Sequence, residues 1–90
     1  MNNTKMLIGS LSNDLYRVAT LANRGSIDNA KTFHKESQRW IRELEHKSLK
    51  PYMKQIILHL KKTDVNNIKQ DAEDYLMYSI LLQNYALHFC

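Results

Sequence analysis

Residues 26–46 read SIDNAKTFHKESQRWIRELEH, and this stretch decides the fold class. It contains no glycine or proline, and it starts with Ser26 and Asp28, which are residue types that cap helix N-termini. Its apolar positions recur at helical spacing, which indicates an amphipathic helix rather than a strand. We expect Trp40 to lie at the centre of the core. The predicted inner arc consists of Ala30, Phe33, Ser37, Trp40, Ile41 and Leu44.

The segment before this stretch predicts a first helix over about residues 4–23. Arg24-Gly25 then supplies a C-terminal cap, because glycine adopts the left-handed conformation that often ends a helix. Gly9 weakens the first turns, since a glycine inside a helix costs about 1 kcal/mol relative to alanine. The ordered part of this helix could therefore begin at Ser12.

The segment after this stretch predicts two more helices. A third helix begins after Ser48, with Pro51 in its first turn, and ends near residues 61–62. Thr63-Asp64 offers the next N-cap, and a fourth helix is expected over about residues 65–88 as the longest of the four.

The three connections between these helices are short, and short connections make sequence neighbours pack antiparallel. The sequence has only two glycines and one proline, and no alternating apolar and polar run predicts a strand. We therefore predict an all-α fold, an antiparallel up-down-up-down four-helix bundle. Residues 1–90 should form a single domain, because a chain of this length cannot enclose two cores.

The composition favours a soluble, cytoplasmic protein. The single cysteine, Cys90, excludes an internal disulfide framework and is expected to be incidental. No apolar stretch approaches the roughly 20 residues that cross a bilayer, so no membrane contact is expected. No glycine-rich phosphate loop is present, and we predict no cofactor.

The fourth predicted helix is apolar on two sides. One arc, expected to face the core, holds Val65, Ile68, Ala72, Leu76, Ser79, Ile80, Gln83, Ala86 and Leu87. The opposite arc is too apolar for a free monomer surface, so we expect a homodimer or another protein partner to cover it. Two alternatives are that its own chain packs on both sides of this helix, or that a ligand groove forms there. The predicted interface residues are Met77, Tyr78, Leu81, Tyr85 and Phe89.

Basic residues gather in the middle of the chain, although the net charge is only +4. Residues 29–62 hold nine lysines and arginines against three glutamates. Part of this charge forms a stripe along the second helix, which could bind the phosphates of nucleic acid or an acidic protein surface. The plainer interpretation is a solvated helix face. The candidate polyanion-binding residues are Lys31, Lys35, Arg39 and Arg42.

Two short patterns at the end of the second helix resemble parts of catalytic and metal-binding sites. Arg39 and His46 resemble the arginine–histidine spacing of the helical HEPN nucleases, which implies a phosphate clamp and an acid or base acting on RNA at a dimer interface. Those nucleases have a polar residue directly after the arginine, where this chain has Trp40. Glu43 and His46 form one Glu-x-x-His, whereas the iron centres of ferritin-like bundles need two copies and further glutamates. We predict no catalytic residues and no metal site.

Three functions follow, and the first is preferred. The protein would be a non-enzymatic interaction protein that associates through its fourth helix and presents its basic face to an acidic partner. The alternative is a non-specific nucleic-acid-binding protein that uses the basic stripe. Small basic helical bundles of about this length also include bacteriocin immunity proteins, so neutralisation of a toxin is the third hypothesis, an analogy of fold alone.

Overall fold

The computed structural model describes residues 3–89. Within this range the chain forms helices and no strand, which confirms the predicted all-α four-helix fold. Cys90 lies outside the described residues. The elements are α1 (Asn3–Asn23), α2 (Ile27–Leu44), α3 (Pro51–Lys61), the short 3-10 helix η1 (Val65–Asn67) and α4 (Ala72–Phe89).

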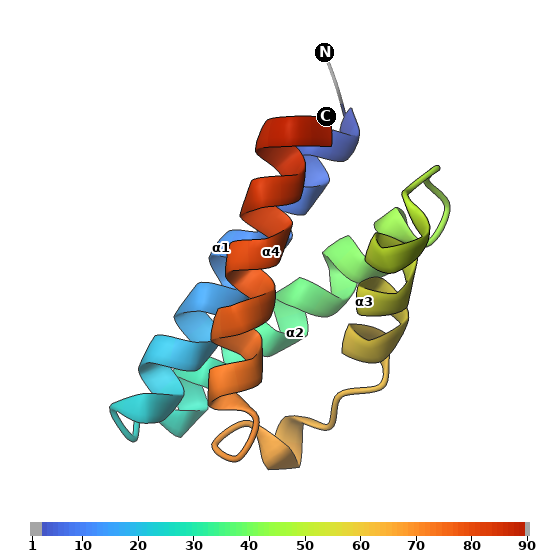
Figure 1. Ribbon diagram of the computed structural model, residues 1–90. Coiled ribbons are helices and arrows are strands. Elements are labelled where there is room, and N and C mark those ends of the chain that lie inside the picture. The colour runs from blue at the N-terminus through green and yellow to red at the C-terminus, as the bar shows by residue number, and fades with distance from the viewer. Residues whose placement is uncertain (1–2, 90) are drawn as a thin grey trace.

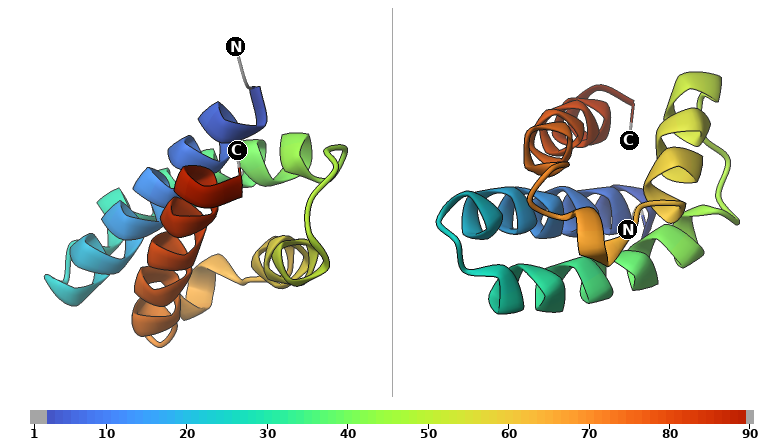
Figure 2. Two further views of the ribbon diagram at one scale, coloured as in Figure 1. Left: turned by 45° about the horizontal axis from the view of Figure 1, so that its top comes forward. Right: turned by 90° about the horizontal axis from the view of Figure 1, so that it is seen from below.

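Helix α1 is the central element of the bundle. It packs against both α2 and α4, and α3 contacts α2 near the end of that helix. Figure 1 shows α1 and α4 side by side and running in opposite directions, so that both ends of the chain lie at the same end of the bundle. Figure 2 shows α1 between α4 and α2, with α3 set to one side.

The sequence of α1 explains this central position, because its buried side chains span an arc of about 160°, from Asp14 on one edge to Ser12 on the other. The helix continues through Gly9 from Asn3, since the residues on either side of that glycine are anchored in the core. The buried apolar residues of α1 are Leu7, Ile8, Leu11, Leu15, Val18, Ala19 and Ala22. The possible later start at Ser12 is therefore not what the structure shows.

Small residues line the contact between α1 and α4. Ala72, Ser79 and Ala86 are buried on α4 at intervals of seven residues, and Ser12 and Ala19 show the same interval on α1. Small side chains at a helix contact shorten the distance between the axes. The two helices are tied by the Ser12 hydroxyl, which donates to the Ser79 carbonyl at 2.7 Å.

The predicted turn after α1 is confirmed. Gly25 has a φ of 81°, a conformation that other residues rarely adopt. Its amide donates to the Ala22 carbonyl at 3.0 Å, and the Ser26 amide donates to the Leu21 carbonyl at 2.9 Å, so the last carbonyls of α1 are satisfied.

Trp40 does not occupy the centre of the core, contrary to the sequence-based expectation. It is only partly buried, at the edge between α1 and α2, because its Nε1–H needs a polar partner. That partner is Asp14 of α1, whose Oδ2 accepts this hydrogen bond at 2.8 Å. The buried aromatic residues are instead Tyr75, which is 1% exposed, and Tyr85, which is 4% exposed.

The start of the predicted fourth helix is also corrected. Asp64 caps the segment as expected, since its Oδ1 accepts from the Asn66 amide at 2.9 Å, but the capped element is η1. A turn follows η1, and α4 begins only at Ala72. Helix α4 therefore has 18 residues, and α1, with 21, is the longest helix.

Truncating the core of α1 should unfold the protein more readily. We expect Leu11→Ala, at a fully buried position, to lower the free energy of unfolding by about 2–5 kcal/mol, because it removes packed methyl groups and leaves a cavity. Met6→Ala, on the exposed side of the same helix, is the matched control and should change it by only about 0.5 kcal/mol. Urea unfolding followed by circular dichroism measures both. Equal losses would mean that α1 is not the central element.

Candidate functional site

The main candidate site is an exposed apolar surface on α4. Five of the nine large hydrophobic side chains that are exposed in residues 3–89 belong to this helix. Ile80 is 54% exposed and Leu87 is 63% exposed, which is unusual for residues of this type. We define the outer face of α4 as Met77, Ile80, Leu81, Asn84 and Leu87, with Glu73 and His88 at its ends; all seven are exposed.

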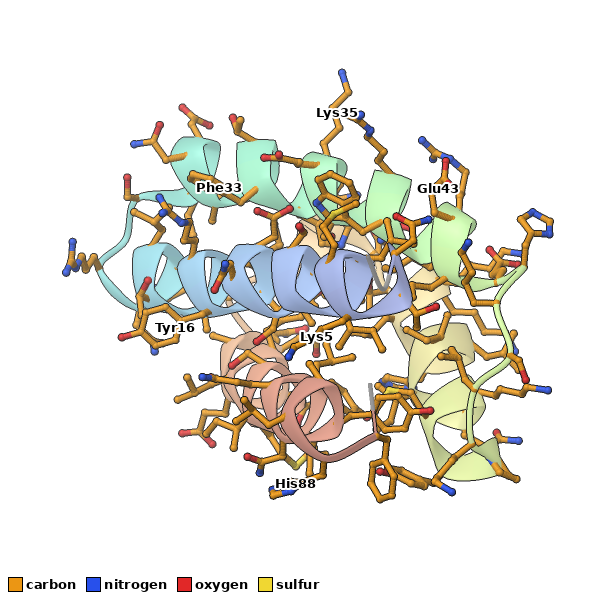
Figure 3. The ribbon with its side chains drawn as sticks, turned by 90° about the horizontal axis from the view of Figure 1, so that it is seen from above. Lys5, Tyr16, Phe33, Lys35, Glu43 and His88 are labelled. Atoms are coloured by element: carbon orange, nitrogen blue, oxygen red, sulfur yellow. The ribbon has the colours of Figure 1, made fainter. Side chains whose placement is uncertain are left out.

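The spacing of these residues makes the outer face a continuous seam. Glu73, Met77, Ile80, Asn84 and Leu87 follow one another at intervals of four and three residues. Such spacing places side chains along one line of a helix, as in the contact seams of coiled coils. Figure 3 shows that His88, at the end of this seam, points away from α1.

The five predicted interface residues differ in their exposure to solvent. Met77 and Leu81 are exposed on the outer face, as expected. Tyr85 is not exposed, and this part of the expectation is wrong: the side chain is buried at the junction with α3, where its hydroxyl accepts a hydrogen bond from the Lys50 amide at 3.0 Å.

Tyr78 and Phe89 also have partners from the same chain. The half-buried Tyr78 ring lies 5.5 Å from the His59 ring of α3, measured between centroids. Phe89 is half exposed, but its ring lies 5.2 Å from that of Tyr85. This side of α4 is therefore packed by α3, which was the alternative in which the chain covers its own apolar surface.

The predicted core arc of α4 differs from the observed one by a little less than one residue step of about 100°. Ile80, Leu87 and Gln83 were expected inside and are exposed, whereas Tyr75 and Leu82 are buried. The physical reason is that the predicted helix extended back to residue 65. The apolar residues before Ala72 therefore helped to define which side of it would face the core. The segment before Ala72 is not α-helical, so the buried face of Ile68 does not continue into α4.

A hollow borders the outer face where α4 meets α1. Tyr16, which is 54% exposed, and Ile80 lie on its walls, and Gln83 supplies an amide. The other lining residues are Ser12, Asn13, Leu76 and Ser79. The exposed apolar surface therefore extends from α4 onto α1.

The basic stripe on α2 is a second candidate. Lys31, Lys35, Arg39 and Arg42 are all exposed, and none of them forms an ion pair with an acidic side chain of residues 3–89. Lys35 projects from the side of α2 that is turned away from α1 (Figure 3). The Arg39 guanidinium lies 4.9 Å from the centroid of the Trp40 ring, which holds this cation against the surface.

The Arg39–His46 and Glu43–His46 patterns lie at the end of α2. Arg39 is in the helix, whereas His46 is exposed in the turn that follows it. Glu43 is exposed on α2. Within the described residues, no group of three or more histidine, cysteine, aspartate or glutamate side chains is placed to hold a metal ion.

A buried carboxylate, which was not predicted from the sequence, lies between α1 and α2. Asp14 is 7% exposed and borders a surface pocket. Asp14 follows Leu11 by three residues and precedes Leu15 by one, which places it on the apolar side of α1. A charged residue at such a position is the sequence signal that could have predicted a buried carboxylate. The pocket is also lined by Ser10, Asn13, Arg17, Phe33, Glu36 and Trp40.

The surroundings of Asp14 favour its neutral form. The pKa of the carboxyl group is raised to about 6. Burial is the main cause and the nearby Glu36 carboxylate adds to it, while the hydrogen bond from Trp40 and the charge of Arg17 oppose the shift. Arg17 lies over the Phe33 ring, 5.2 Å from its centroid, and forms no ion pair with either carboxylate. Near neutral pH the protein therefore holds an incompletely compensated negative charge at the α1–α2 contact.

A second buried polar group joins α2 to the segment before η1. The Nε2 atom of His34 lies 3.1 Å from the Thr63 hydroxyl oxygen, and the ring packs edge-on against Tyr75 at 5.9 Å. Burial lowers the pKa of His34, and the charge of Asp64 opposes this shift. The buried Tyr75 hydroxyl has no hydrogen-bond partner within the described residues.

The buried serines of α2 and α4 satisfy their hydroxyl groups within their own helices. The Ser37 hydroxyl donates to the His34 carbonyl, and the Ser79 hydroxyl donates to the Leu76 carbonyl, each at 2.6 Å. Such bonds satisfy a hydroxyl inside a helix without any catalytic role.

Comparisons with known proteins found no similarity. The chain matches no protein-family model, and no curated protein or solved structure is significantly similar to it. Among the described residues, no helix is both long and apolar enough to span a membrane.

Neutralising Asp14 should stabilise the fold at high pH. Because its folded pKa is raised, the folded state holds this proton more tightly than the unfolded chain, and the associated stability is lost as the pH rises through about 6. We expect Asp14→Asn to raise the free energy of unfolding at pH 8 by about 1–3 kcal/mol and to change it little near pH 4.

Urea unfolding at both pH values measures this difference, and Glu43→Gln, at an exposed site on α2, is the control that should show no such dependence. His34, whose lowered pKa acts in the opposite direction, is present in every variant and cancels in the comparison. A loss of stability in Asp14→Asn at pH 8 would show that the bond to Trp40 requires the charge.

Proposed function

We propose that the protein is a non-enzymatic helical bundle that binds another protein chain through the outer face of α4. The observation that carries this proposal is the exposure of Met77, Ile80, Leu81 and Leu87 along one helix. Contiguous apolar surface on a soluble domain costs free energy in water, and its burial by a partner is the common way to recover it.

The support beneath the outer face favours a rigid contact surface. Tyr85 and Tyr78 pack α4 against α3, while Ser12 fixes it to α1. Helix α4 has 18 residues, which corresponds to a length of about 27 Å. A seam of this length with four-and-three spacing suits a helix of the partner, whose side chains can fit between those of α4.

The proposed site of action is the cytoplasm. The single cysteine of the sequence provides no internal disulfide, which fits a reducing compartment.

A second candidate function is the binding of a polyanion by the basic stripe. The observation that favours it is that four exposed cations share one side of α2 and form no ion pair within residues 3–89. Glu36 lies among these cations, but cations that are not held in an ion pair are available to phosphates. Trp40 is the aromatic residue beside the stripe, and it is partly buried, so the stripe offers no exposed ring for base stacking. Such binding would therefore be independent of the nucleic-acid sequence.

The main proposal can be tested by photo-crosslinking in cells that express the protein. A photoreactive phenylalanine analogue in place of Ile80 should give a discrete covalent adduct with another protein chain, whereas the same analogue in place of Leu58, which is 45% exposed on α3, should not. Adding Leu81→Asp should abolish the adduct while leaving helicity unchanged, because a carboxylate would be desolvated in the contact. Equal labelling from positions 58 and 80 would sink the proposal.

The polyanion hypothesis predicts a steep dependence on salt. With four phosphate contacts, the affinity for duplex DNA should fall about 100-fold between 50 and 200 mM salt. Fluorescence anisotropy of a labelled duplex measures this, and Lys35→Glu with Arg39→Glu should abolish binding. Arg24→Glu with Lys69→Glu changes the net charge equally at other exposed sites and is the control. Equal effects of the two pairs would mean that the stripe is not the binding surface.

A further inference from the structure

The outer face of α4 is electrically polarised along its length. Its N-terminal end carries Glu73 and Asp74 in the first turn of the helix. At its C-terminal end the cation is Lys50, which lines a surface hollow together with His88 and whose Nζ lies 4.8 Å from the centroid of the Phe89 ring. A surface with opposite charges at its two ends is complementary to a copy of itself turned end to end.

The positions of Glu73 and His88 agree with such a pairing. Glu73 and His88 are equally far from the midpoint between Ile80 and Leu81, one towards each end of α4. If a two-fold axis passes through that midpoint, Glu73 of each copy faces His88 of the other, while Ile80 and Leu81 of both copies meet at the centre. The helix dipoles also oppose each other in this arrangement, which is favourable.

Parallel pairing is less favourable on the same observations. It would place Glu73 and Asp74 of one copy beside the same residues of the other, so that four carboxylates met at one end. The central apolar contacts would be retained, but like charges would be brought together and the dipoles would align. Charge therefore selects the antiparallel arrangement.

We infer that the partner of the outer face is a second copy of this protein, packed antiparallel on α4 about the midpoint between Ile80 and Leu81. The inference rests on the proposed function, because it names the chain that covers the same surface. The interface would be isologous, with one patch used by both copies, which is the commonest form of dimer. Tyr16 and the hollow beside Ile80 would lie along one edge of this contact.

Disulfide trapping tests the partner and the orientation together. All variants carry Cys90→Ser, so that the introduced thiol is the only one in the chain. Ile80→Cys, near the axis, should form a covalent dimer under mild oxidation. Glu73→Cys alone should not, because antiparallel packing separates the two thiols by about 22 Å along the helix. Glu73→Cys mixed with His88→Cys should form the mixed disulfide.

A control variant measures non-specific disulfide formation, and a mass measurement tests the association itself. Arg39→Cys, exposed on α2, should remain monomeric under the same oxidation. Light scattering on the unmodified protein should give a mass that rises from monomer to dimer with concentration.

The other outcomes separate the inference from the proposed function. A covalent dimer of Glu73→Cys alone would mean parallel packing, which overturns the inference and leaves α4 as the binding surface. A monomeric mass without a disulfide at position 80, together with a photo-adduct to a different protein, would also overturn only the inference. If neither experiment detects a contact at position 80, both are wrong.

Discussion

Two hydrogen bonds on opposite sides of α1 fix the arrangement on which the rest of the structure depends. Ser12 binds the Ser79 carbonyl of α4, and Asp14 accepts from Trp40 of α2. These residues are two positions apart, so they point about 200° away from each other around the helix. Because α1 is held from both sides, α2 and α4 need not contact each other extensively, and each keeps one side free for solvent or a partner.

This arrangement also explains which parts of the fold could be predicted from the sequence and which could not. Helix periodicity, Gly25 after α1 and Pro51 at the start of α3 are local signals, and they predicted the four helices and two of the three connections. The side of α4 that faces the core depends on a contact with α1, which lies more than 60 residues away in the chain. Periodicity alone cannot reveal that contact on a helix that is apolar on several sides.

The candidate site was predicted only in part, again because contacts distant in sequence decide which side chains of α4 are buried. Met77 and Leu81 belong to the outer face, whereas Tyr85 is used by α3, because an aromatic hydroxyl can satisfy the free Lys50 amide at the start of that helix. Ile80 and Leu87 looked like core residues because they share an arc with Ala72 and Ala86. The observed core instead takes Tyr75 and Leu82, and the Tyr75 ring packs edge-on against the His34 ring of α2.

The packing of α4 within the bundle uses its inner side and leaves the outer face exposed. The stripe that packs on α1 is built around Ala72, Ser79 and Ala86, and the short side chains allow the close approach that the Ser12 hydrogen bond requires. The larger buried residues of α4, Tyr75, Leu82 and Tyr85, also lie on its inner side, so α4 covers the core with that side alone. Polar residues at Ile80 and Leu87 would satisfy this packing equally well and would be better hydrated. Apolar side chains at those positions fit the proposed contact outside the bundle, and the seam they form on α4 is the surface that such a contact would use.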